Sequence, residues 1–366
     1  MLLSKLHIYQ YRNISDVTLQ CHPNINCIIG KNGIGKTNLL DSIYYLAFCK
    51  SNILSNDSLN ILHEHDSFII QEDFTNKDKE YAISCSYTKN KDKRIICNDK
   101  KYARFSDHIG LIPLIFISPG DITLINGGGS ERRKFLDSYI SLYDAEYLQN
   151  LLKYNKLLAQ RNSILKQSKR IDYPYLEIID EQIVAIGTAI QEKRKDAVTE
   201  LENKTIKFYH QISSQDSITI EYESHVTPED YHALLKKNFE KDCILGYSSS
   251  GIHRDDLVFS FNSGILKQCG SQGQKKSFLL AIKFAQYQIL KKKKESPPIL
   301  LLDDLFDKLD SERTKKVFEI IGGDDFGQIF ITDTDKTLLH TFFEEKNYTG
   351  TFWTFENGEI KEDSTY

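Results

Sequence analysis

The residues best suited to chemistry form a glycine-rich segment near the N-terminus, Gly30-Lys31-Asn32-Gly33-Ile34-Gly35-Lys36-Thr37. The segment fits G-x-x-x-x-G-K-[ST] at every fixed position, with an apolar strand pattern before it and a helical pattern, 38–49, after it. Glycines let backbone N–H groups curl around phosphate oxygens, and the helix N-terminus adds the positive end of its dipole. We expect Lys36, on an exposed loop, to reach the β- and γ-phosphates of ATP, and the Thr37 hydroxyl to ligate Mg²⁺.

Two adjacent acids end an apolar run far along the chain. Ile299-Leu300-Leu301-Leu302 leads directly into Asp303-Asp304, and the run follows Pro297-Pro298, which suits the start of a strand. An apolar run that ends in two acids is by itself usually structural. Beside a phosphate-binding loop, however, Asp303 would hold Mg²⁺, directly or through water, and Asp304 would polarise the attacking water. We therefore take these two acids as candidate catalytic residues.

A third segment, Ser271-Gln272-Gly273-Gln274, stands at the start of a helical pattern that runs to residue 294. A serine at a helix start followed by glycine is an anion-binding arrangement, although plain capping is the commoner reason for such a serine. The serine lies 28 residues before Ile299. This resembles the order in ABC-type ATPases, in which a signature serine contacts the γ-phosphate held by the opposite protomer.

The elements that must position these residues predict an α/β fold. Strand patterns dominate residues 1–130, and they include a hairpin of 81–87 with 94–97. Helix and strand alternate from 272 to 332, which implies a parallel sheet with helices on its faces. Two long helical patterns, 131–168 and 175–211, lie between these regions, and an αα-hairpin is their simplest interpretation.

Composition narrows the class of protein. The 366 residues are 40% hydrophobic and 27% charged, as in soluble globular proteins, which excludes a disordered, collagenous or integral membrane protein. We see no signal-peptide pattern and expect a cytoplasmic protein. The formal net charge of −4 gives no support for nucleic-acid binding, so any basic surface must be local.

Several motifs, taken in order along the chain, resemble the RecF family of bacterial recombination-mediator ATPases, which are related to the SMC proteins. They are Tyr11-Arg12-Asn13 and Asn24-Ile25-Asn26 ahead of the glycine-rich segment, Gly127 with Arg132-Arg133-Lys134-Phe135-Leu136-Asp137, Ser250-Gly251-Ile252-His253-Arg254-Asp255-Asp256-Leu257, the Ser271 segment, and Leu301-Leu302-Asp303-Asp304 with Leu309-Asp310. The resemblance runs from residue 1 to about 335. It departs from the family at Gly120, Gly129 and Ile252, none of which is a phosphate or Mg²⁺ ligand.

The resemblance implies an ABC-type P-loop ATPase head with a mixed β-sheet and an inserted helical lobe. The ATPase lobe would comprise 1–130 and 245–366, and the mainly helical lobe 131–244. The nucleotide-binding residues implied beyond the glycine-rich segment are Arg12, Ser271, Gly273, Gln274 and Asp310.

The resemblance also implies a function in DNA replication, recombinational repair and the SOS response. ATP would clamp two protomers into a dimer that grips duplex DNA near single-strand gaps. With RecR and RecO as partners, the dimer would help RecA displace single-strand-binding protein. Slow, DNA-stimulated ATP hydrolysis would reset the clamp.

One segment could supply the contacts to DNA. Residues 147–170 contain no acid and six basic residues, Lys153, Lys156, Arg161, Lys166, Lys169 and Arg170. These do not fall on one helical stripe, so a solvated helical tip and contact with DNA phosphates both stay open. Lys153, Lys156 and Arg161 are the candidate DNA-binding residues.

Two other classes of protein are alternatives to an ATP-dependent DNA-binding protein. A P-loop small-molecule kinase would need a mobile lid and a substrate pocket, and it would leave the Ser271 segment unexplained. An ATP-gated protein scaffold is compatible with Asp304, which is shorter than the glutamate common in fast ABC ATPases. DNA-stimulated ATP turnover would separate all three classes.

Overall fold

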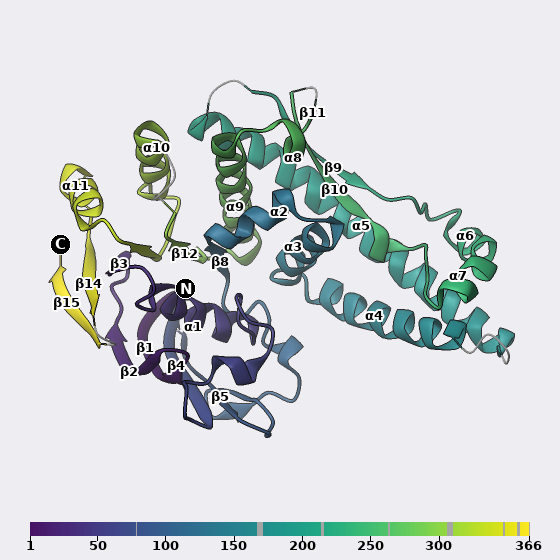
Figure 1. Cartoon of the computed structure of the whole chain (residues 1–366), viewed down its shortest axis with the longest axis horizontal. Helices are drawn as coiled ribbons and strands as arrows, with labels where there is room; N and C mark the ends of the chain where they lie inside the picture. Colours follow the sequence, from purple (N-terminus) through teal and green to yellow (C-terminus); the bar gives the residue numbers. More distant parts are fainter. Residues whose placement is uncertain are drawn as a thin grey trace. The chain divides into compact units, whose positions relative to one another are not determined.

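The computed structural model describes residues 1–77, 79–166, 171–213, 216–262, 264–305, 310–346, 348–356 and 359–365. The chain forms two compact units, unit 1 with Met1–Asp121 and Lys283–Tyr366, and unit 2 with Ile122–Ile282 (Figure 1). This division differs from the predicted boundaries at 130 and 245. Residues 245–282 belong to unit 2 because their strand β10 (Asp256–Phe261) pairs with β9 (Ile218–Glu223) of the same unit.

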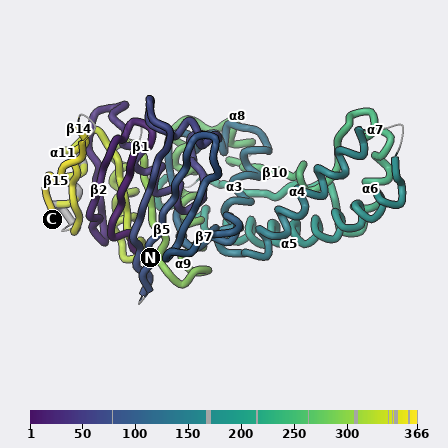
Figure 2. The backbone as a smooth tube through the Cα atoms, turned by 90° about the horizontal axis from the view of Figure 1, so that it is seen from below, coloured from purple at the N-terminus to yellow at the C-terminus, as the bar shows by residue number. Residues whose placement is uncertain are grey.

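One sheet of unit 1 is antiparallel, with the strand order β2-β1-β4-β5-β6-β7 (Figure 2). Its strands are β1 (Leu2–Tyr11), β2 (Ile14–Gln20), β4 (Ser67–Asn76), β5 (Lys79–Thr88), β6 (Arg94–Cys97) and β7 (Lys100–Lys101). The pairing of β5 with β6 confirms the predicted hairpin. Burial alternates along much of β4, so this sheet has one face in the core.

The second sheet of unit 1 has the strand order β15-β14-β3-β13-β12-β8. Its strands are β3 (Ile25–Ile29), β8 (Leu114–Ile117), β12 (Ile299–Asp303), β13 (Ile329–Asp333), β14 (Gly350–Glu356) and β15 (Glu359–Thr365). Only the β14–β15 pair is antiparallel, so the sheet is mixed. Because the carboxyl ends of parallel strands meet at one edge, the residues that follow β3, β12 and β13 come together there.

Helix α1 (Lys36–Phe48) packs between the two sheets of unit 1 and contacts strands of both. This position explains why its apolar residues Leu39, Leu40, Ile43 and Leu46 are all fully buried. Helix α10 (Ser311–Ile321) connects β12 to β13, and α11 (Lys336–Lys346) connects β13 to β14. The alternation of strand and helix predicted from the sequence is therefore confirmed for this part of the chain.

Unit 2 is built on the helices α3 (Gly129–Ser141), α4 (Ala145–Lys166) and α5 (Tyr173–Ile212). The single helix predicted over 131–168 is wrong, because the chain breaks at 142–144. There the Asp144 carboxylate accepts a hydrogen bond of 2.9 Å from the backbone N–H of Tyr147, as an N-cap does.

Helices α4 and α5 form the predicted αα-hairpin. They lie alongside one another in Figures 1 and 2. Lys193 pairs with Asp144 at one end and Arg161 with Asp180 at the other, which fixes an antiparallel arrangement.

The rest of unit 2 is a three-stranded sheet with short helices. The antiparallel sheet has the order β11-β10-β9. The remaining elements are α2 (Thr123–Asn126), α6 (Tyr231–Lys237), α7 (Phe239–Leu245), a 3-10 helix (Ile252–Arg254), β11 (Gly264–Ile265), α8 (Leu266–Cys269) and α9 (Gln272–Lys294), which continues into unit 1. Among the described residues, no helix combines the length and the apolar character that a membrane span needs.

Candidate nucleotide-binding site

The glycine-rich segment forms the loop between β3 and α1. Gly33 has a φ of 79°, and Gly35, the N-cap of α1, has a φ of 122°; residues with a side chain rarely adopt such backbone angles. A Cβ at Gly30 would come within 2.8 Å of the Phe355 carbonyl oxygen. The N-terminus of α1 receives no side-chain cap. The loop therefore has the form that phosphate oxygens require.

Lys36 is buried, so the expectation of an exposed side chain is wrong. The residue begins a helix that is packed between two sheets, and its side chain turns back into the loop. Its ammonium donates to the carbonyl oxygens of Gly30 at 2.8 Å and Lys31 at 3.3 Å, and it lies 3.7 Å from the Asp304 carboxylate. The charge is thus held inside the loop, where the phosphates of a nucleotide would lie.

Thr37 and Asp303 are brought together as the sequence predicts. The Thr37 hydroxyl lies 2.9 Å from both carboxylate oxygens of Asp303. The hydroxyl of Thr332 donates to the same carboxylate at 2.8 Å. Strand register explains the contact, because Asp303 pairs with Thr332, which in turn pairs with Ile28 just before the loop.

This group of oxygens fits Mg²⁺. Hydroxyl and carboxylate oxygens are the hard ligands that Mg²⁺ prefers, and the ion commonly uses one carboxylate together with the phosphates of its substrate. Burial raises the pKa of Asp303 above its usual value, because the charged form loses solvation. A bound cation would favour the ionised form. Bound Mg²⁺ would shield the charge of the phosphates.

A chain of side chains fixes the backbone of the loop, and sequence reasoning missed part of it. The Arg12 guanidinium donates to the Asn38 side-chain oxygen, the Asn38 amide to the Asn13 side-chain oxygen, and the Asn13 amide to the Ile34 carbonyl, each at 2.7 Å. Arg12 therefore acts on the loop through two asparagines, and its direct contact with nucleotide stays a prediction. The sequence contains one indication of these asparagines, because Asn13 directly follows Arg12 and Asn38 directly follows Thr37. Both therefore stand next to predicted nucleotide-binding residues.

A second anchor holds the loop that follows β8. The Lys283 ammonium, on α9, donates to the Phe116 carbonyl and the Asp121 carboxylate, both at 2.9 Å. Asp121 also accepts the backbone N–H of Ser118 at 2.7 Å. No feature of the sequence pointed to Lys283, because a lysine inside a long helical pattern usually faces solvent.

The Ser271 segment lies in unit 2 and forms a capping box. The backbone N–H of Ser271 donates to the Gln274 side chain at 2.9 Å, and the Ser271 hydroxyl accepts the backbone N–H of Gln274 at 3.2 Å. Ser271 is exposed, and Gly273 is half-buried. Capping thus explains the local structure, and contact with a nucleotide of another protomer stays a prediction.

Asp310 caps α10, since its carboxylate accepts the backbone N–H of Arg313 at 2.9 Å. Its neighbour in the motif, Leu309, lies outside the described residues. The capping contact does not decide whether Asp310 also meets nucleotide, so that role stays a prediction.

Comparison with known proteins decides the family. The sequence matches the RecF/RecN/SMC N-terminal domain family over residues 2–353. The DNA replication and repair protein RecF of Phocaeicola vulgatus is 40% identical to it over 365 residues, which cover 99% of this chain and 98% of the relative. This chain is 45% identical over 339 residues to the same protein of Flavobacterium johnsoniae, with 91% and 94% covered. The chain belongs to the RecF family.

Solved structures agree with this assignment to the RecF family. The recombination mediator protein RecF-ATP in the RecFOR pathway superimposes with a TM-score of 0.90 at 30% identity, covering 99% of this chain and 98% of that one. An Smc head domain from Pyrococcus furiosus superimposes with a TM-score of 0.59 at 18% identity, with 100% and 96% covered, and this likeness shows the fold alone. The fold is that of an ABC-type ATPase head.

The candidate DNA-binding residues of this RecF-family chain separate into two groups. Lys153 and Lys156 are exposed on α4. Arg161 is fully buried, and its guanidinium pairs at 2.8 Å with the carboxylates of both Asp180 and Asp242. The prediction that Arg161 contacts DNA is therefore wrong, because its side chain is buried and its Nε and Nη1 hold α4 to α5 and α7. Lys169 and Arg170 lie outside the described residues.

Proposed function

We propose that this protein is an ATP-dependent DNA-binding protein of DNA replication and recombinational repair. The observation that carries the proposal is the contact of Thr37 with Asp303 at 2.9 Å beside the glycine-rich loop, in a chain of the RecF family. Its relatives are named DNA replication and repair proteins, and a solved relative is described as RecF-ATP.

In this proposal the chain binds ATP with Mg²⁺ and hydrolyses it slowly. The loop backbone and Lys36 hold the phosphates, while Thr37 and Asp303 hold Mg²⁺. Asp304 orients the attacking water, and DNA stimulates turnover. Arg12, Gly273, Gln274 and Asp310 complete the nucleotide site of the ATP-bound form.

ATP would join two protomers, because Ser271 is exposed at a helix N-terminus and can meet the γ-phosphate on a second copy. The dimer binds duplex DNA near single-strand gaps in the cytoplasm. Together with RecO and RecR it helps to load RecA. The naming of a relative within the RecFOR pathway supports this partnership.

DNA binding tests the proposal directly. Affinity for a duplex oligonucleotide, measured by fluorescence anisotropy, should require ATP and fall steeply with salt, by about 0.9 in log–log slope for each phosphate contact. Lys153→Glu with Lys156→Glu should weaken binding and flatten the slope. Lys195→Glu with Lys207→Glu changes the charge equally on exposed positions of α5 and should have little effect. Equal affinity with and without ATP would refute the proposal.

Dimerisation tests the part played by Ser271. Asparagine and aspartate are both good N-caps, so Ser271→Asn and Ser271→Asp preserve the start of α9. Aspartate also places a negative charge where a γ-phosphate would bind. In sedimentation with ATP and Mg²⁺, Ser271→Asp should stay monomeric and Ser271→Asn should retain more dimer. Equal dimerisation of both variants would leave Ser271 with a capping role alone.

A further inference from the structure

Arg133 on α3 is a half-buried cation without a carboxylate partner. Its Nη1 donates to the Asp255 backbone carbonyl at 2.6 Å. Within the part of the chain that the structure describes, no carboxylate lies within ion-pairing distance of its guanidinium, and a guanidinium has five N–H donors. Burial lowers the pKa of Arg133 from its usual value, which reports the loss of solvation that an anion would offset.

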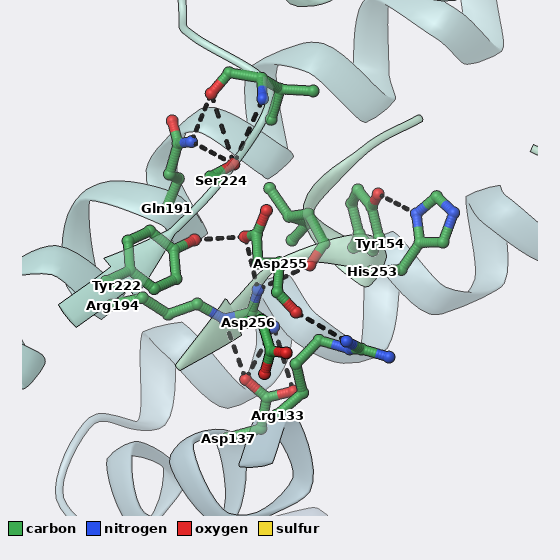
Figure 3. A network of polar contacts seen from close by, with 12 residues as sticks. Arg133, Asp137, Tyr154, Gln191, Arg194, Tyr222, Ser224, His253, Asp255 and Asp256 are labelled. Carbon is green, nitrogen blue, oxygen red and sulfur yellow. Dashed lines mark hydrogen bonds and ion pairs between the residues drawn. The ribbon is translucent and has the colours of Figure 1, made fainter. Parts of the chain in front are cut away.

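The neighbouring arginines differ, because their charges are neutralised. Arg132 forms a bidentate pair with Asp256, with both distances at 2.7 Å. Arg194 pairs with Asp137 at 2.8 Å and with Asp255 at 3.0 Å. Figure 3 shows Arg133 joined to Asp255 by a single contact, with the rest of its guanidinium pointing away from the Arg194 cluster. Of these three arginines, Arg133 is thus the one whose charge has no paired carboxylate and whose guanidinium keeps N–H donors for a further partner.

A cavity of about 230 Å³ opens beside Arg133 within unit 2. This is several times the ~30 Å³ that one water occupies in the liquid. Its lining includes Ser130, Lys134, Tyr154, Asn155 and His253. Ser130 lies in the first turn of α3, whose N-cap is Gly128. Because glycine has no side chain to cap the first N–H groups, the positive end of this 13-residue helix adds to the charge of Arg133.

His253 adds no charge to this cavity. Its Nε2 donates to the Ser248 carbonyl at 3.0 Å, which leaves Nδ1 to accept from the Tyr154 hydroxyl at 3.0 Å. Burial lowers the pKa of His253 to about 4, so the ring is neutral at physiological pH. Among the residues that line the cavity there is one carboxylate, that of Asp137, and it is already paired with Arg194. The Lys134 ammonium pairs with Glu131 at 3.0 Å, but both side chains are exposed. An exposed pair of this kind contributes little to stability, so Lys134 stays available to an anion.

We propose that this cavity, here called the Arg133 pocket, binds one phosphate group through the Arg133 fork, the Lys134 ammonium and the N-terminus of α3. A phosphate presents oxygens in several directions, which suits donors that approach from different sides. The inference rests on the proposed function in assigning the phosphate to the DNA backbone, because Asn155 of the pocket lies on α4 between Lys153 and Lys156. A free phosphate offers the same chemistry, and the experiment separates the two sources.

The first arm uses inorganic phosphate as the probe. Binding is followed by ³¹P NMR line broadening of the full-length protein carrying Lys36→Ala, so that the glycine-rich loop contributes little. Arg133→Gln or Lys134→Gln in this background should weaken phosphate binding about tenfold, since each removes charge-assisted hydrogen bonds. Lys195→Gln removes an exposed charge outside the pocket and should change nothing. Unchanged phosphate binding in both pocket variants would overturn the proposal. Lys134→Gln should leave the fold intact, because Lys134 is 72% exposed and loses only a surface pair with Glu131.

The second arm measures duplex DNA affinity with ATP against salt, with Lys36 intact. Arg133→Gln should flatten the log–log slope by about 0.9 for each protomer engaged, and Lys195→Gln should not. A loss of phosphate binding with an unchanged DNA slope would overturn the assignment to DNA and favour free phosphate. If the unaltered protein failed to bind DNA, the proposed function would fall, and the first arm alone would decide the pocket.

Discussion

Replacement of Arg161 by methionine should destabilise the protein strongly without altering ATP binding. The guanidinium donates three hydrogen bonds of 2.8 Å, to Asp180, Asp242 and Ser248. The side chains of Arg161 and Asp242 are 0% exposed and that of Asp180 is 7% exposed. Methionine fills most of the volume and leaves two buried carboxylates without their cation. Breaking a buried pair from one side costs about 3–5 kcal/mol.

The assay is urea unfolding of the full-length protein followed by circular dichroism. Arg161→Met should lower the free energy of unfolding by that amount, and the midpoint should fall without a change in slope. Arg161→Lys keeps the charge but loses the planar fork, so it should cost less. Lys153→Met, an exposed neighbour on α4, should change stability by about 0.5 kcal/mol or less. A loss below about 1 kcal/mol in Arg161→Met would refute the argument for a buried ion-pair network.

Three further predictions concern the nucleotide site and the core of unit 1. Lys36→Met should weaken ATP binding by about 30-fold or more, because a buried charge contact is typically worth about 2–5 kcal/mol; titration with a fluorescent ATP analogue measures this, and normal affinity would remove Lys36 from the site. Asp303→Asn should weaken Mg²⁺ binding. Asp304→Asn should keep ATP binding, lower turnover by about 10²-fold or more and accumulate the ATP-bound dimer. Unchanged turnover in Asp304→Asn would place the catalytic base elsewhere. Glu72 is fully buried, its carboxylate oxygens have no hydrogen-bond partner among the described residues, and burial raises its pKa well above the usual 4.5. Because the folded state then holds a proton that the unfolded chain releases above pH 4.5, stability falls as pH rises from that value. Glu72→Met should therefore stabilise the protein by about 1–3 kcal/mol at pH 8, with a smaller gain at pH 5, and thermal melts that show the same difference at both pH values would contradict the argument.

Local sequence determines the parts of the site that are contiguous in the chain. The glycine-rich loop could be predicted because eight consecutive residues carry both its backbone angles and its functional groups. The strand that ends at Asp303 and the capping box at Ser271 follow for the same reason, since each depends on residues at most four positions apart. The order of these motifs was also sufficient to indicate the family.

Contacts between distant elements decided the rest. Thr332 joins Asp303 because β13 lies between β3 and β12, an order of strands that no local pattern records. Arg161 is buried because Asp180 and Asp242, 19 and 81 residues away, converge on it; helical periodicity alone left it among surface lysines. The sequence shows that a residue is an arginine and therefore charged. Its partners depend on which side chains the tertiary structure brings within hydrogen-bonding distance. Those partners decide whether the arginine holds helices together, as Arg161 does, or is open to an anion, as Arg133 is.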